Sequence, residues 1–174
     1  MLKKFYPKKY VKSTYSIDFE KCYEKGFRGV LFDIDNTLVP HGEPADEKAV
    51  ELFKRLDEIG FKYCLISNNK GPRIIPFAKA VGAKNYIVDA HKPMVKSYKK
   101  AMELMETDET NSMFVGDQIF TDVFGANLAH MYTILVKPIH PKEEIQIVLK
   151  RYLEKIVLRC YLKDKKKKGN TSEK

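Results

Sequence analysis

Two aspartates, Asp33 and Asp35, lie two residues apart at the end of an apolar run, GVLFDI at 29–34, that predicts a buried strand. One carboxylate of such a pair can attack phosphorus and form an aspartyl-phosphate. The other can protonate the leaving oxygen and later deprotonate the attacking water. The pair therefore predicts phosphoryl transfer, with Asp33 as the nucleophile and Asp35 as the general acid and base.

Further polar residues follow the next predicted strands. They are Ser67 and Asn68 at the end of 61–67, Lys92 shortly after 85–89, and Asp117 and Asp122 at and after the end of 112–117. Any one of them could simply cap a helix. The carboxyl ends of parallel strands meet at one edge of a sheet, however, so we expect these side chains to lie close together. We expect Ser67 and nearby backbone N–H groups, that of Asn68 included, to bind phosphoryl oxygens, and Lys92 to offset negative charge.

The carboxylates at this edge also predict a metal site. Three carboxylates brought together repel one another and raise their own pKa values unless a cation lies between them. Oxygen ligands with room for water and a phosphate are typical of magnesium. We expect Asp33, Asp117 and the backbone carbonyl of Asp35 to bind Mg²⁺ directly. Asp122 would hold a metal-bound water or orient the direct ligands.

The elements that must position these residues are short apolar runs alternating with helical periodicity. Strands are predicted at 29–34, 61–67, 85–89, 112–117 and 132–136, with a helix in each interval. This alternation predicts an α/β fold, a Rossmann-like doubly wound parallel sheet of about five strands with right-handed crossovers.

The flanks of this core, which spans 29–140, differ in character. We expect residues 1–28 to form a basic lead-in with a short helix over 17–25, and residues 163–174 to form a basic disordered tail. Residues 141–162 predict an amphipathic helix that packs on or near the core. Its expected apolar stripe consists of Ile145, Val148, Leu149, Tyr152, Ile156 and Cys160.

Charge and cysteine content limit the setting of the protein. The net charge of +9 comes from the two ends, because five lysines in 1–12 face no acid and six lysines in 163–174 face two. Such ends attract anionic membrane, nucleic acid or acidic protein, or remain solvated. The three scattered cysteines predict neither a disulfide framework nor a zinc site. With no signal-peptide pattern or long uncharged run, we expect a cytoplasmic protein, with peripheral contact on the inner face of the membrane as one option.

Four short motifs connect these residues to a known family. DIDNT (33–37), SNN (67–69), HKP (91–93) and GDQIFTD (116–122) resemble, in order, the four motifs of the haloacid dehalogenase superfamily of phosphatases. More closely, about 5–150 resembles the YqeG family of subfamily IIIA, which is related to the mitochondrial phosphatidylglycerophosphate phosphatases of fungi. The resemblance implies Asp33 as nucleophile, Asp35 as general acid and base, Ser67 for phosphate, Lys92 as stabilising base and Asp117 for magnesium. A small residue, usually glycine, is expected where Ala129-His130 is found, and we interpret His130 as a surface residue at a helix end.

The spacing of the motifs leaves no room for a cap domain. One helix and one strand use the residues between Thr37 and Ser67, and the same holds between Ser67 and Lys92. An open, capless site favours large substrates. We expect a magnesium-dependent phosphomonoester hydrolase acting on phosphatidylglycerophosphate. The alternatives are a phosphatase of a phosphoprotein or a nucleic-acid end, and a non-catalytic RNA- or ribosome-binding module that uses the basic ends.

Overall fold

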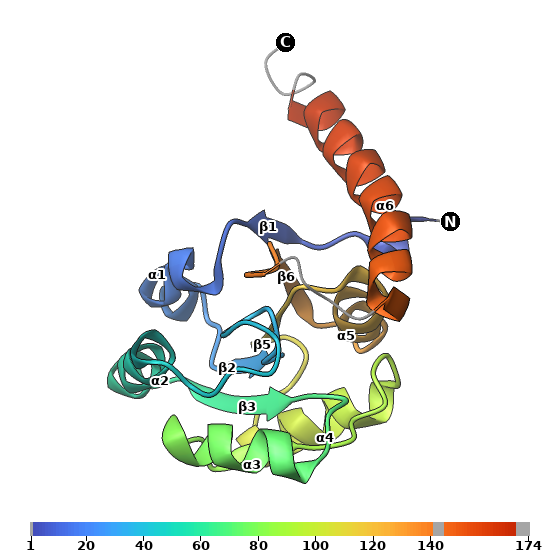
Figure 1. The fold of residues 1–174 in the computed structure, drawn as a ribbon. Coiled ribbons are helices and arrows are strands. Elements are labelled where there is room, and N and C mark those ends of the chain that lie inside the picture. Colours follow the sequence, from blue (N-terminus) through green and yellow to red (C-terminus); the bar gives the residue numbers. More distant parts are fainter. Residues whose placement is uncertain (1, 141–144, 170–174) are drawn as a thin grey trace.

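The computed structural model describes residues 2–140 and 145–169. They are organised around a parallel sheet of six strands in the order β1-β6-β5-β2-β3-β4 (Figure 1). The strands are β1 Lys9–Val11, β2 Gly29–Phe32, β3 Lys62–Ile66, β4 Asn85–Ile87, β5 Ser112–Gly116 and β6 Tyr132–Val136. The expected Rossmann-like, capless α/β class is confirmed.

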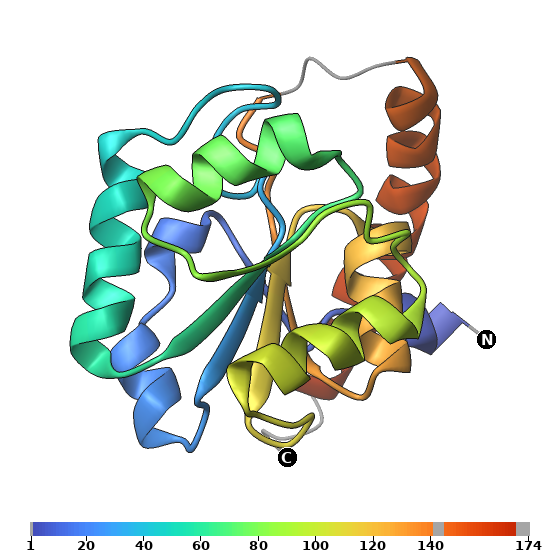
Figure 2. The ribbon, with the colours of Figure 1, turned by 90° about the horizontal axis from the view of Figure 1, so that it is seen from below.

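Helices cover both faces of this sheet. They are α1 Phe19–Glu24, α2 Glu47–Ile59, α3 Gly71–Ala80, α4 Val95–Met105, α5 Phe124–Leu128 and α6 Ile145–Gly169. Alternate residues of β2 point to opposite faces, so Val30 and Phe32 join a core with α1, α2 and α3, whereas Leu31 joins a core with α4 and α5. Figure 2 shows α2 and α4 on opposite sides of the sheet.

Local sequence signals set the ends of the helix that follows β2. The Asp46 carboxylate accepts a hydrogen bond from the Ala49 N–H at 2.8 Å and caps the start of α2. Gly60 ends the helix with a positive φ of 96°, a conformation in which glycine has no steric penalty. The segment between β2 and β3 therefore contains only this helix and its connecting loops, and no additional domain is inserted there.

The N-terminal segment contributes more to the fold than the sequence indicated. β1 pairs in parallel with β6 and adds an edge strand, so the sheet has six strands where we expected about five. Its three residues are too few to show a strand pattern. The short helix expected over 17–25 is present as α1, and its Phe19 is buried in the core.

Two expectations for the C-terminal helix were wrong. α6 continues to Gly169, so 163–169 is helical and was not the start of a disordered tail; 170–174 lies outside the described residues. In the expected stripe, Tyr152 and Ile156 are 69% and 49% exposed, whereas Glu154, Val157 and Tyr161 are buried. Cys160 is partly buried, and Ile145, Val148 and Leu149 lie outside the described side chains. The C-terminal half of α6 extends away from the sheet (Figure 1).

We expect Gly125→Ala to destabilise the protein by about 1–3 kcal/mol, because an added methyl group overpacks a buried contact. A Cβ at Gly125 of α5 would clash with the hydroxyl of Tyr98. Tyr98 is fully buried and donates to the Thr121 carbonyl at 2.7 Å, so it has little freedom to move. Urea unfolding measures the change, with Leu128→Ala at an exposed site of α5 as control. Equal stability of the two variants would contradict this packing argument.

Candidate active site

The candidate residues meet at the carboxyl edge of the sheet, around β2. Asp33 follows β2, Ser67 follows β3 and Asp117 follows β5, and both outer strands pair directly with β2. Lys92 comes from the loop after β4, and Asp122 from a π-helical turn, Ile119–Val123, that follows β5. All five side chains are buried. The structure thus gathers groups from four loops at one place.

Lys92 links two of the carboxylates. Its Nζ donates to Asp33 Oδ1 at 2.6 Å and to Asp122 Oδ1 at 2.7 Å, and the lysine side chain is only 3% exposed. Burial lowers the pKa of this lysine, but the charges of Asp122 and Asp33 outweigh burial and the pKa is raised. Lys92 is therefore a permanent cation beside the proposed nucleophile.

The ionised form of Asp33 remains unfavourable despite its contact with Lys92. Burial, to which the charge of Asp122 adds, outweighs the attraction of Lys92 and raises the pKa of Asp33 to about 7. The folded protein therefore binds this proton more tightly than the unfolded chain does. Between the ordinary aspartate pKa and about 7, folding stability accordingly falls as the pH rises. A further cation beside ionised Asp33 would therefore stabilise the folded protein.

The Asp35 carboxylate is held apart from this cluster by three donors. Its Oδ1 accepts from the Gly42 N–H at 2.9 Å and pairs with a guanidinium nitrogen of Arg73 at 2.8 Å. Its Oδ2 accepts from the Asn69 side-chain amide at 2.6 Å. Sequence reasoning missed Arg73, which lies in α3 and becomes a partner of Asp35 only through the packing of α3 over the loop. The carboxylate is therefore oriented before a substrate arrives.

The two polar residues after β3 have different contacts. The Ser67 hydroxyl accepts from the Asn69 backbone N–H at 3.1 Å. The Asn68 side chain accepts from the Lys92 N–H at 2.6 Å and donates to the Lys92 carbonyl at 3.3 Å. The Asn68 amide thus holds the backbone of Lys92 in place. Phosphate binding by the Ser67 hydroxyl and by the backbone N–H groups of this turn stays a prediction.

Three carboxylates form a group that could bind a metal ion. Oxygens of Asp33, Asp117 and Asp122 all lie within 4.8 Å of one another. The Thr37 hydroxyl lies beside them, 3.3 Å from Asp117 Oδ1. Oxygen donors in a buried, negatively charged group are the ligands that a hard divalent cation such as Mg²⁺ prefers. Asp122, for which we expected a supporting role, thus lies where it could also bind a metal directly. The Asp35 carboxylate is not part of this group, and its backbone carbonyl stays a predicted ligand.

An arginine from α6 reaches this acidic group. Arg151 donates to the Asp117 carbonyl at 2.6 Å and forms an ion pair with the Asp117 carboxylate. Burial nevertheless raises the pKa of Asp117 well above its usual range, and the charge of Arg151 offsets this only in part. Nothing in the sequence identified Arg151, because it lies 34 residues from Asp117 and is one of several basic residues of α6.

Glu154, one turn further along α6, supports the same loop. Its Oε1 accepts from the backbone N–H groups of Ile119 at 2.6 Å and Phe120 at 3.2 Å, and its Oε2 pairs with Arg151 at 3.0 Å. Burial raises the pKa of Glu154, and Arg151 with the two N–H groups opposes this. These polar contacts turn one face of α6 toward the loop after β5, and Tyr152 and Ile156 of the predicted stripe are exposed.

The remaining site expectation concerned His130. This residue is exposed, has a φ of 61° and lies beside Lys3 and Lys4, away from the carboxylate cluster. The positive φ gives a physical reason for the small residue expected at this helix end.

Comparisons with known proteins agree with this geometry. Residues 42–130 match the family model of haloacid dehalogenase-like hydrolases. The chain is 36% identical over 160 residues to "Probable phosphatase YqeG" of Bacillus subtilis (strain 168), covering 91% of this chain and 92% of that protein. It is 30% identical over 169 residues to "Phosphatidylglycerophosphate phosphatase 1, chloroplastic/mitochondrial" of Arabidopsis thaliana, covering 88% of this chain but 47% of that protein.

Solved structures share the fold at low sequence identity. The cobalt-bound deoxy-D-mannose-octulosonate 8-phosphate phosphatase (YrbI) of Haemophilus influenzae superposes with a TM-score of 0.54 at 13% identity, over 79% of this chain and 90% of that chain. An uncharacterized protein from Listeria monocytogenes serotype 4b superposes with a TM-score of 0.53 at 17% identity, over 68% and 86% of the two chains.

Proposed function

The chain belongs to the haloacid dehalogenase-like hydrolases and is a phosphatase, and we propose that it hydrolyses the phosphomonoester of phosphatidylglycerophosphate with the help of Mg²⁺. The main support for this reaction is the surroundings of the buried Asp33. Lys92 Nζ donates to Asp33 Oδ1 at 2.6 Å, and Asp117 and Asp122 lie beside it. The match to the Arabidopsis phosphatase supports the substrate.

In the proposed reaction, Asp33 attacks phosphorus and an aspartyl-phosphate forms as the bond to the leaving oxygen breaks. Lys92 binds Oδ1, which leaves Oδ2 to attack. Asp35 protonates the leaving oxygen and then takes a proton from the water that hydrolyses the intermediate. Because Arg73, Gly42 and Asn69 hold Asp35 in the described conformation, one of these contacts must be exchanged for the leaving oxygen.

The residues present fit a magnesium ion. We propose that Asp33, Asp117 and Asp122, together with the Asp35 backbone carbonyl, would hold it. A bound Mg²⁺ supplies a positive charge that stabilises the phosphoryl oxygens in the transition state. Lys92, whose Nζ contacts both Asp33 and Asp122, would offset the charge of the nucleophile.

Arg151→Met is expected to strengthen Mg²⁺ binding about tenfold or more, because Arg151 and the metal compete for the Asp117 carboxylate. The metal-free variant should also unfold at a lower temperature, since Asp117 loses its cation. Titration calorimetry and thermal unfolding with and without Mg²⁺ measure both effects. Arg159→Met, an exposed arginine of the same helix, is the control. If Mg²⁺ binds the Arg151 variant more weakly, Arg151 orients Asp117 for the metal and the competition model is wrong.

The open site is suited to a substrate that is itself large enough to cover it. The segments between Thr37 and Ser67 and between Ser67 and Lys92 contain only α2 with β3 and α3 with β4, so no cap covers the carboxyl edge. A lipid headgroup at a membrane is such a substrate. No described helix is long and apolar enough to cross a membrane. We propose peripheral contact with the cytoplasmic face of an anionic membrane through the basic ends, each lysine contributing on the order of 1 kcal/mol.

Phosphate release from phosphatidylglycerophosphate in mixed micelles, compared with an aryl phosphate at equal Mg²⁺, tests the proposal. We expect lipid turnover to exceed aryl phosphate turnover and to disappear on removal of the metal. Turnover of the aryl phosphate alone would keep the reaction but reject the lipid, and would direct the search to phosphoproteins and nucleic-acid ends. No turnover of any phosphomonoester would reject the catalytic assignment and favour a binding module.

A further inference from the structure

Arg73 lies beside the proposed general acid and base. Its Nε and Nη2 donate to Asp35 Oδ1 at 3.3 and 2.8 Å. The third nitrogen, Nη1, makes no hydrogen bond among the described residues. It is accessible to solvent, because the Tyr161 hydroxyl is the one buried side-chain group of those residues without a partner. The end of the guanidinium formed by Nη1 and Nη2 therefore keeps two parallel N–H donors, the arrangement that binds two oxygens of a phosphate.

Arg73 differs in this respect from the other cations that contact the candidate site. Lys92 and Arg151 each pair with two carboxylates, and the Lys92 side chain is 3% exposed. Arg73 pairs with one carboxylate, and its side chain is 20% exposed. No cap covers the site, since only helices and strands of the core lie between Thr37 and Lys92. Arg73 therefore has both the donors and the access to contact a group of the substrate.

The position of Arg73 matches a group on the leaving side of the substrate. The leaving oxygen must come within hydrogen-bond reach of the Asp35 carboxylate, to which Arg73 Nη2 donates at 2.8 Å. In the headgroup proposed above, a single glycerol unit separates the leaving oxygen from a phosphodiester. A phosphodiester at that spacing lies within reach of a guanidinium that is already in contact with the acid, and arginine is the side chain best suited to bind it.

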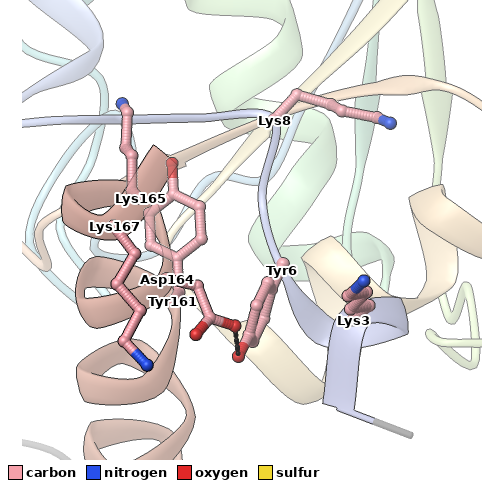
Figure 3. Close-up of a pocket in the computed structure, with 7 residues that line it drawn as sticks. All are labelled: Lys3, Tyr6, Lys8, Tyr161, Asp164, Lys165 and Lys167. Carbon is pink, nitrogen blue, oxygen red and sulfur yellow. Dashed lines mark hydrogen bonds between the residues drawn. The ribbon is translucent and has the colours of Figure 1, made fainter. Parts of the chain in front are cut away.

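A second group of cations is too distant to contact the same headgroup. A cleft between the N-terminal segment and α6 is lined by lysines, among them Lys3, Lys8 and Lys165 (Figure 3). Lys165 lies roughly 20 Å along the axis of α6 from Arg151, which contacts the candidate site. One glycerol unit cannot bridge that distance. These lysines therefore do not recognise a second charge on a headgroup held at the carboxyl edge of the sheet.

We propose that Arg73 binds a second anionic group on the leaving side of the substrate, a phosphodiester one glycerol unit away from the leaving oxygen. Nη1 and Nη2 donate to the diester while Arg73 keeps its contact with Asp35, and the leaving oxygen replaces Asn69 or Gly42. The same side chain thus orients the acid and selects the leaving group. The inference rests on the phosphatase reaction and on the headgroup proposed above, and it requires neither acyl chains nor a membrane.

A pair of soluble substrates tests the inference apart from the lipid. Glycerophosphoglycerophosphate carries the monoester and a charged diester, and in its counterpart the diester is methylated to a neutral triester. We expect the wild type to have a kcat/KM about tenfold or more higher for the charged compound, because the triester loses a charge-assisted contact. Arg73→Met should remove this preference and Arg73→Lys should retain part of it. Lys165→Met, which removes the same charge from the cleft in Figure 3, should keep it in full.

The preference is a ratio within one variant, so a loss of Asp35 orientation, which slows both compounds, does not change it. Titration calorimetry on Asp33→Asn in the presence of Mg²⁺ makes the same comparison without turnover. We expect this variant to bind the charged compound about tenfold more tightly, and Asp33→Asn with Arg73→Met to bind both equally.

The outcomes separate this inference from the lipid substrate. A preference that persists in Arg73→Met, or equal kcat/KM and equal affinity for the two compounds when Arg73 is present, would overturn the inference even if the lipid is hydrolysed. A charge preference that disappears with Arg73 would support it, and would do so even if the lipid in micelles is not a substrate.

Discussion

Asp33→Asn should lower kcat by about a thousandfold or more, because the amide oxygen is a poor nucleophile and the aspartyl-phosphate cannot form. The substitution keeps the size of the side chain, which is buried beside Lys92 and Asp122. Steady-state assays with an aryl phosphate under saturating Mg²⁺ measure the loss without assuming the lipid substrate.

The stability of the same variant separates a chemical role from a structural one. Burial raises the pKa of Asp33 to about 7, so ionised Asp33 destabilises the metal-free protein at neutral pH and above. We therefore expect metal-free Asp33→Asn to be at least as stable as the wild type at pH 8. The difference should shrink as the pH falls toward 6, where the wild-type carboxyl takes up its proton. Near-wild-type activity in the folded variant would remove Asp33 from the nucleophile role.

Lys92→Met should also lower kcat by about a hundredfold to a thousandfold, because the phosphoryl group and the nucleophile lose their compensating charge. Unlike Asp33→Asn, it should destabilise the protein, by about 3–5 kcal/mol, since removing one partner of a buried ion pair leaves uncompensated charge. Lys92 pairs with Asp33 and Asp122 at 2.6 and 2.7 Å, so two buried carboxylates lose a cation at once.

Urea unfolding at pH 8 and at pH 6 measures this cost, with Lys96→Met on the exposed face of α4 as the control. The destabilisation should be smaller at pH 6, where Asp33 is more readily protonated. An additional Asp33→Asn substitution should restore part of the lost stability, because it removes one of the two charges left unpaired. A Lys92 variant as stable as the Lys96 variant would show that the buried ion pairs contribute nothing net to folding.

Most of the candidate site could be predicted from sequence because its residues occupy fixed places relative to the strands. Asp33, Ser67 and Asp117 each follow an apolar run, and the ends of parallel strands must converge. Once the alternation of strands and helices was clear, the edge of the sheet on which these side chains lie was clear as well. The spacing of the motifs predicted a core without a cap, and in the structure only α2 with β3 and α3 with β4 lie between Thr37 and Lys92.

The exact partners within the site could not be predicted in this way. Asp35 pairs with Arg73, and Asn68 holds the backbone of Lys92, through loop conformations that have no sequence pattern. Asp122 lies near Asp33 because a π-helical turn brings its carboxylate back toward the strand ends. Short segments such as β1 are equally difficult, because three residues carry almost no periodicity.

From Gly29 onward, the sequence by itself determined the succession of strands and helices up to β6, the edge of the sheet that carries the candidate site, and the residue types that suit phosphoryl transfer. All of these depend on local periodicity and on strand ends. Only the tertiary structure decided how α6 meets the rest of the chain. Its apolar stripe predicted a face with Tyr152 and Ile156 inward, yet Arg151 and Glu154 turn the opposite face toward Asp117 and the loop after β5. The physical reason is that buried charges and unpaired N–H groups cost more than exposed apolar side chains, so polar contacts between distant segments set the rotation of the helix.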